Sequence, residues 1–198
     1  MVSYQLVSLI PTSQVNEIPG FHRERVQIKN IQENRTVDVD DVDYVSDIIA
    51  NKNSEFTLKN GDLLMAMTGA TVGKFGLIVN KKELCLLNQR VARFIPNVGK
   101  NPWFIYCALL NDIFLNQIIE RAEGSAQPNV SAGCIKSAKL SVPPDQLIKH
   151  FILKVDSLFQ NIIQNVQESR TLASLRDTLL PRLLSGELSF NELNAAAS

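Results

Sequence analysis

Residues 145–180 contain neither glycine nor proline, and their apolar side chains recur at heptad spacing. This pattern is typical of one long amphipathic helix. At a rise of about 1.5 Å per residue the helix would be about 50 Å long, whereas a domain of about 140 residues is roughly 30 to 35 Å wide. We therefore expect part of the helix to project from the preceding domain and to need a partner for its apolar stripe. The alternative is a helix that folds back across its own domain.

The heptad register indicates which residues of this helix face a partner. Asp145 is the expected N-cap, Ile148 takes position a, and two polar layers fall at Asn165 and Ser169. Leu183, Leu184 and Leu188 follow Pro181 and lie beyond the regular heptads. The predicted partner surface consists of Ile148, Phe151, Val155, Leu158, Ile162, Leu172, Leu179, Leu183 and Leu184.

The residues before this helix indicate short strands separated by turns. Strand signals occur at residues 36–45, 63–67, 75–79, 86–95 and 139–142, bounded mainly by glycine, lysine and proline. In the first of these, Val37, Val39, Val42 and Tyr44 are expected to face inward. The module should be curled and mostly antiparallel.

One buried helix is expected inside this module. Asn101 and Pro102 predict its start, because a capping side chain precedes a proline at the first helical position, and Gly124 ends it. The helix should cover residues 103–122, and one short helical turn should follow before residue 139. The predicted fold class is α+β, with a β-rich domain over residues 1–144 and a long coiled-coil helix and terminal segment over residues 145–198.

Composition describes an ordinary globular protein rather than a disordered or membrane protein. Of 198 residues, 45% are apolar and 20% are charged, and the formal net charge is zero. No apolar run approaches the roughly 20 residues needed to cross a bilayer, and no basic leader precedes the apolar start of the chain. We expect a cytoplasmic protein without a membrane segment.

Cysteine and histidine usage argues against a metal site. Cys85, Cys107 and Cys134 are widely spaced and form no C-x-x-C pair, and neither His22 nor His150 has a partner at ligand spacing. No serine lies in a G-x-S-x-G elbow that would indicate a hydrolase triad. We expect no metal, no cofactor and no catalytic residue.

The segment GATVGK over residues 69–74 has some features of a phosphate-binding loop but departs from it. Only three residues separate Gly69 from Gly73, and Phe75 follows Lys74 where a serine or threonine would hold magnesium. A strand pattern rather than a helix pattern follows. Nucleotide hydrolysis is therefore not expected.

Five blocks of sequence occur in an order typical of one protein family. They are GDLLMAMTGATVGKFGLIV (61–79), LNQRVARFIP (87–96), GSAQPNVS (124–131), LSVPPDQLI (140–148) and LRDTLLPRLLSGEL (175–188). In this order they resemble the specificity subunit of type I restriction-modification systems. The resemblance spans most of the chain from Asp62 onward and is loose over residues 1–60, where such proteins vary.

This resemblance implies a non-catalytic subunit. A target recognition domain would read half of a bipartite site in double-stranded DNA, and the spacer helix would dock the methyltransferase and restriction subunits. A full specificity subunit has two recognition domains and two helical regions, whereas this sequence has one of each, so we interpret it as a half subunit. Two copies would then pair as a homodimer through antiparallel helices, or the chain would pair with another specificity polypeptide.

Two alternatives remain open at this point. One is a protein-interaction scaffold that reads no DNA, in which the helix alone is functional. The other is the recognition domain of a stand-alone adenine methyltransferase, although Pro143-Pro144 is followed by Asp145 and not by the aromatic residue of an adenine-methylating motif.

The DNA face is expected to be assembled from loops. Arginine and lysine would contact phosphates, while asparagine, glutamine and threonine would also reach base edges. The predicted DNA-binding residues are Arg23, Arg25, Lys29, Thr68, Thr71, Lys74, Arg90, Gln127 and Asn129. Each has a structural alternative: the arginines could pair with Glu24 and nearby aspartates, the glycines could only form turns, and residues 88–90 could only tie strands together.

Overall fold

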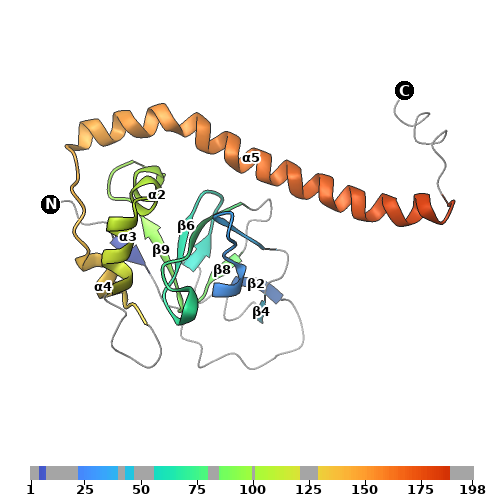
Figure 1. Ribbon diagram of the computed structural model, residues 1–198, viewed down its shortest axis with the longest axis horizontal. Coiled ribbons are helices and arrows are strands. Elements are labelled where there is room, and N and C mark those ends of the chain that lie inside the picture. The colour runs from blue at the N-terminus through green and yellow to red at the C-terminus, as the bar shows by residue number, and fades with distance from the viewer. Residues whose placement is uncertain are drawn as a thin grey trace. The chain divides into compact units, whose positions relative to one another are not determined.

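A computed structural model describes residues 5–7, 22–39, 43–46, 56–79, 85–99, 101–120 and 129–187 (Figure 1). The chain divides into two units, Met1–Gln160 and Asn161–Ser198, and helix α5 (Asp145–Leu184) contributes to both. The first unit combines mixed β-sheets with short helices, so the predicted α+β class is confirmed. None of the helices in the described part of the chain combines the length and apolar character needed to span a membrane.

Two sheets form the body of the first unit. Within the described ranges, the first sheet has the order β1 (Gln5–Val7), β9 (Val91–Ile95), β6 (Leu63–Ala66), β7 (Phe75–Ile78) and β3 (Thr36–Val37). The second has the order β4 (Asp43–Ser46), β2 (His22–Val26), β8 (Cys85–Leu87) and β5 (Thr57–Leu58). Most pairings are antiparallel, as expected, while β2–β8 and β3–β7 are parallel. The strands predicted at 63–67 and 75–79 are confirmed as β6 and β7.

Two predicted strands each divide into two strands that belong to different sheets. Residues 86–95 separate into β8 and β9 because Asn88 makes a tight turn: its Oδ1 accepts from the Arg90 N–H at 2.9 Å and its carbonyl accepts from the Val91 N–H at 3.0 Å. Residues 36–45 likewise supply β3 and the start of β4. Val37 and Val39 are buried as expected, whereas residue 42 and the Tyr44 side chain lie outside what the structure describes.

A third predicted strand is absent. Residues 139–142 have no regular secondary structure in this part of the described chain, between α4 (Ala132–Ser137) and α5. They precede Pro143-Pro144, and proline has no N–H to donate to a sheet ladder. The short helical turn expected before residue 139 is confirmed as α4.

The predicted buried helix is two helices. α2 (Trp103–Leu109) and α3 (Asp112–Ile119) are separated at Asn111, whose side chain accepts from the N–H groups of Ile113 and Phe114 and so starts a new helix. The prediction that Asn101 caps the first helix was wrong, because Pro102 holds that position. Gly124 lies outside the described residues.

Asn101 instead helps to join α2 to α5 within the first unit. Its Nδ2 donates to Asp156 Oδ1 at 2.7 Å, and the same oxygen accepts from Trp103 Nε1 at 2.7 Å. The Trp103 ring stacks on Phe159 with centroids 4.3 Å apart and planes 1° apart, and Tyr106 meets Phe159 edge-on at 5.2 Å. A hydrogen-bonded carboxylate and a stacked aromatic pair therefore fix the helix on its domain.

Gly99 allows this approach at the end of the first sheet. Its φ is +79°, and a Cβ on it would lie 2.8 Å from the Ile152 Cδ1 atom of α5. Of the apolar residues in the first part of α5, Ile148, Ile152 and Phe159 are buried. This part of the helix thus packs on its own domain.

The limits of α5 differ from the prediction at both ends. The Pro144 carbonyl accepts from the N–H groups of Leu147 and Ile148, so Asp145 is the first helical residue and not the N-cap. At the other end the helix runs through Pro181 to Leu184, and the Ser185 N–H donates to the Pro181 carbonyl at 2.9 Å. Proline cannot donate a backbone hydrogen bond, but the Pro181 carbonyl still accepts one, and the helix continues past it. Leu183 and Leu184 therefore continue the helix.

Replacing Phe159 with alanine should lower the free energy of unfolding by about 3 to 5 kcal/mol, because it leaves a cavity beside Trp103. Denaturant unfolding followed by fluorescence of Trp103, the chain's one tryptophan, measures this loss. Leu153→Ala on the same helix is the matched control: this side chain is 77% exposed, and its loss should change stability by less than about 0.5 kcal/mol. Equal losses in the two variants would contradict a packed junction.

Candidate nucleic-acid interface

Three segments that are distant in sequence meet beside Met67. The Met67 N–H donates to the Arg90 carbonyl at 3.0 Å, and the Met67 carbonyl accepts from the Val130 N–H at 2.8 Å. An isolated antiparallel bridge joins Thr68 to Asn129. Three predicted DNA-binding residues, Thr68, Arg90 and Asn129, are thus brought together. The side chains of Arg90 and Asn129 are exposed, and Thr68 is half-buried.

The turn between β6 and β7 carries two further predicted residues. It contains the 3₁₀ helix η4 (Gly69–Thr71), after which Gly73 has a φ of +84°. A Cβ on Gly73 would lie 2.7 Å from the side chain of Ile119, so glycine is needed for both backbone conformation and packing. Thr71 is exposed and Lys74 is half-buried. Strand β7 follows directly, which agrees with the exclusion of a phosphate-binding loop.

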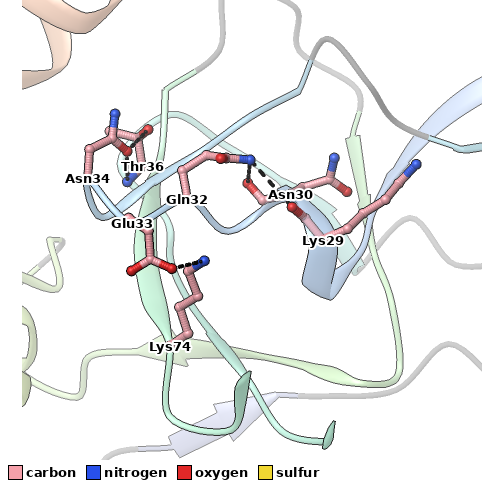
Figure 2. A network of polar contacts seen from close by, with 7 residues as sticks. All are labelled: Lys29, Asn30, Gln32, Glu33, Asn34, Thr36 and Lys74. Atoms are coloured by element: carbon pink, nitrogen blue, oxygen red, sulfur yellow. Dashed lines mark hydrogen bonds and ion pairs between the residues drawn. The ribbon is translucent and has the colours of Figure 1, made fainter. Parts of the chain in front are cut away.

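A polar segment over residues 27–36 lies beside this turn (Figure 2). It begins with the 3₁₀ helix η2 (Ile28–Asn30), where Asn30 Oδ1 accepts from the Gln27 N–H at 2.8 Å. Asn34 Oδ1 then accepts from the Thr36 N–H at 3.1 Å and from the Thr36 hydroxyl at 2.7 Å. Gln32 Nε2 lies 3.4 Å from the Lys29 carbonyl, to which it donates. Short side chains thus hold this segment in one conformation.

An ion pair connects the polar segment to the turn. Glu33 Oε1 lies 2.7 Å from Lys74 Nζ, as Figure 2 shows, and the Glu33 side chain is 93% exposed. The hydrogen bond from Lys74, and then its positive charge, lower the pKa of Glu33 below its ordinary value. Lys74 is therefore a predicted DNA-binding residue that already has an acidic partner.

Arg35 is a further basic residue of this region that the sequence interpretation missed. Among the described residues it is the one non-glycine residue with positive φ, at +61°. Its guanidinium lies over the Phe75 ring, 4.5 Å from the centroid. The run Gln32-Glu33-Asn34-Arg35 was a turn signal, since asparagine tolerates such bends, but nothing in it indicated a neighbour at Lys74.

Of the remaining predicted residues, Lys29 belongs to the polar segment, whereas Arg23 and Arg25 lie on a strand of the second sheet. Arg23 and Arg25 lie on β2, opposite Val45 and Asp43 of β4, so the expectation of a loop there was wrong. The structure describes their backbone but not their side chains. Lys29 is exposed on η2, and Gln127 lies outside the described residues. Whether these residues bind DNA stays a prediction.

A second ion pair has a structural role. Arg93 of β9 donates to the Thr57 carbonyl of β5 at 2.7 Å and lies 3.5 Å from Asp62 Oδ2, so it ties the first sheet to the second. Burial raises the pKa of Asp62, while the Lys59 N–H and the Arg93 charge oppose that shift. Within the described ranges, no group of three histidine, cysteine or acidic side chains is arranged to hold a metal ion.

Comparison with known proteins finds one family and several relatives. The family model described as the type I restriction modification DNA specificity domain matches residues 13–169. The specificity subunit of the type I restriction enzyme MjaIX from Methanocaldococcus jannaschii is 32% identical over 96 residues, covering 48% of this chain and 22% of that protein. The HindI specificity subunit from Haemophilus influenzae is 28% identical over 118 residues, covering 59% of this chain and 26% of that protein.

A third relative matches over a longer stretch of the chain but at lower sequence identity. The MjaVIII specificity subunit, also from Methanocaldococcus jannaschii, is 24% identical over 157 residues, which cover 77% of this chain and 37% of the relative. The chain thus spans between about a fifth and two fifths of these relatives' lengths.

The pKa of Glu33 should lie below that of an ordinary glutamate, and Lys74→Met should raise it back to the ordinary range. NMR titration of the side-chain carboxyl carbon measures both values. Because the folded-state pKa is lowered, the ion pair is intact above the ordinary glutamate pKa and is lost as pH falls through the lowered one. An unchanged titration in Lys74→Met would contradict the contact.

Proposed function

We propose that this chain, which belongs to the type I restriction modification DNA specificity domain family, reads a DNA sequence as a non-catalytic recognition subunit of a type I restriction-modification complex. The observation that carries the proposal is the family match over residues 13–169, which includes every segment of the candidate interface. The convergence of the 68–74 turn, Arg90 and Asn129 beside the hydrogen-bonded polar segment supports it.

We assign the residues of this face to phosphate contacts or to base contacts by the chemistry of their side chains. Lys29, Lys74 and Arg90 would contact phosphates, and Arg23 and Arg25 would extend that contact along β2. Thr68, Thr71 and Asn129, with Gln127, carry the hydroxyl and amide groups that can pair with base edges. The protein then fixes its position through the backbone of the duplex and its register through a few bases. We place this DNA-reading domain at residues 1–144.

Residues 145–198 would serve as the scaffold for the methyltransferase and restriction subunits. Support comes from the large apolar side chains that α5 leaves exposed. They include Leu158, Ile162, Leu172, Leu175, Leu180 and Leu184, while Phe151, Val155, Leu179 and Leu183 are half-buried. Ile148 is buried within its own unit, so it is no longer part of the proposed partner surface. Exposed leucines in such numbers are expected to meet another protein.

A homodimer would supply two recognition domains from one kind of chain. Antiparallel pairing of two α5 helices would put Asn165 and Ser169 in polar layers that can set the register. Two identical domains would read the same half-site twice. The target would then be a palindrome interrupted by an unread gap of fixed length.

Replacing Arg23, Arg25 and Lys74 together with alanine should weaken binding to duplex DNA by about tenfold or more. The slope of log affinity against log salt should become shallower by about 2 to 3, because three phosphate contacts are lost. Fluorescence anisotropy over a series of salt concentrations measures both. Alanine at Lys139, Lys149 and Lys154, three exposed lysines elsewhere, changes the net charge equally and is the matched control. Equal effects of the two triple variants would reject this face.

The two alternative functions predict different outcomes in two further experiments. A scaffold that reads no DNA would show no sequence preference even beside a methyltransferase subunit. The recognition domain of a stand-alone methyltransferase would require a catalytic domain on the same polypeptide, which mapping of the methylated adenines together with their enzyme would reveal.

Glutamate at both Leu158 and Ile162 should convert a dimer into a monomer in light scattering, because the two charges would be buried in the helix pairing. Glutamate at Leu147 and Leu153, which are also exposed on α5, is the matched control and should leave the mass unchanged. Circular dichroism checks that both variants keep their β-sheets. A monomeric parent chain, or an asymmetric methylation site for a homodimeric enzyme, would contradict the symmetric arrangement.

A further inference from the structure

Glu33 is an exposed carboxylate on a face that we propose to bind a polyanion. Its side chain is 93% exposed, and its Oε1 atom lies 2.7 Å from Lys74 Nζ (Figure 2). A carboxylate beside phosphates is unfavourable unless something offsets its charge. The position of Glu33 therefore needs a physical explanation.

The backbone that carries Glu33 is held from both ends. The Gln32 N–H donates to the Thr36 carbonyl at 2.8 Å, and the Arg35 N–H donates to the Gln32 carbonyl at 3.1 Å. The Arg35 carbonyl in turn accepts from the Leu77 N–H of β7 at 2.9 Å. Glu33 thus projects from a closed turn anchored on the first sheet.

The packing around Gly76 keeps this turn close to β7. A Cβ on Gly76 would lie 2.9 Å from the carbonyl carbon and oxygen of Arg35. Glycine therefore permits a backbone-to-backbone approach that a larger residue would open. The same strand begins directly after Lys74, so the turn and the lysine are fixed to one element.

Lys74 is held just as firmly. Its carbonyl accepts from the Ala66 N–H at 2.8 Å, and its N–H donates to the Thr71 carbonyl at 3.0 Å. The side chain is only 25% exposed, which restricts the directions in which the ammonium can turn. Arg35, two residues from Glu33, has its guanidinium over Phe75 instead. Lys74 is thus the cation with which the described structure pairs Glu33.

We propose that Glu33 is a restraint on DNA binding, which competes with phosphate for the Lys74 ammonium and lowers the affinity of this face for DNA of arbitrary sequence. The inference rests on the proposed function, because it assumes that Lys74 meets the duplex. Phosphate must displace the carboxylate from Lys74 before it gains the full charge of the lysine. Weaker binding to DNA of arbitrary sequence shortens the residence time at each non-target site, so the protein dissociates and reaches other sites sooner.

Glu33→Gln in the full chain tests the proposal with random-sequence duplex DNA as the probe. Removing the carboxylate should raise affinity about two- to fivefold, the range expected for release of one solvent-exposed ion pair. The plot of log affinity against log salt should become steeper, by part of the roughly 0.9 that one phosphate contact contributes. Anisotropy titrations between about 50 and 200 mM salt give both quantities.

Lys74→Met and the double variant separate a restraint on Lys74 from simple repulsion of phosphate by Glu33. Lys74→Met alone should make the slope shallower by the remainder of about 0.9, because a single lysine supplies one phosphate contact in all. In that background Glu33→Gln should no longer steepen it. The same gain in affinity and slope with and without Lys74 would overturn the proposal, because the carboxylate would then act on DNA directly.

Glu187→Gln is the matched control for net charge. Glu187 is an exposed carboxylate that pairs with Arg182 at 3.0 Å near the end of α5, and its loss should leave affinity and slope unchanged. If Lys74→Met weakens DNA binding but Glu33→Gln has no effect, the restraint is rejected while the DNA face stands. If Lys74→Met has no effect either, Lys74 does not meet DNA and the inference fails, while the triple variant of Arg23, Arg25 and Lys74 decides whether the rest of the face binds DNA.

Discussion

The contact between α2 and α5 is the interaction on which the first unit most depends. Phe159 stacks on Trp103 and makes a T-shaped contact with Tyr106, while Asp156 accepts hydrogen bonds from Trp103 and Asn101. Aromatic pairs of this geometry stabilise a fold beyond the area they bury. Apolar contact supplies most of the attachment, and the half-buried Asp156 carboxylate defines the rotation of the helix about its own axis.

This contact continues from the helix to the candidate DNA face. Tyr106 also meets Phe75 of β7 edge-on at 5.7 Å, and Phe75 carries the Arg35 guanidinium on its ring. A continuous series of packed rings thus runs from α5 to the turn that contains Glu33. The polar segment owes its position to this support, because short polar side chains alone could shape the turn but could not anchor it on a sheet.

On the candidate DNA face, the backbone turns are closed by hydrogen bonds, and some of the basic side chains already have partners within the protein. The turns at 32–36, 68–74 and 88–90 are each closed by local hydrogen bonds, so the side chains they carry start from defined positions. Preformed turns reduce the conformational entropy lost on binding. Basic side chains on this face are partly engaged within the protein, Lys74 by Glu33 and Arg35 by Phe75. Its DNA affinity would therefore depend on exchanging partners as well as on total charge, which is zero for the whole chain.

Local patterns in the sequence were enough to predict the helices, strands and turns that form between residues close together in the chain. Heptad spacing without glycine or proline specified α5, glycine-bounded apolar runs specified β6 and β7, and five ordered blocks indicated the family. The turn at 68–74 was also predictable, since its glycines adopt backbone angles that few other residues tolerate.

Only the tertiary structure decided where two of the expected elements divide and which side chains of different elements contact one another. Asn88 and Asn111 divided two expected elements, because one side chain that caps or turns a backbone outweighs the periodicity around it. Likewise Ile148 became buried while Leu158 on the same predicted stripe stayed 60% exposed, since the position of Trp103 selects which face of α5 meets the domain. The pairing of Glu33 with Lys74 joins residues 41 positions apart. Contacts at that range depend on how sheets and turns pack, which no local pattern in the chain records.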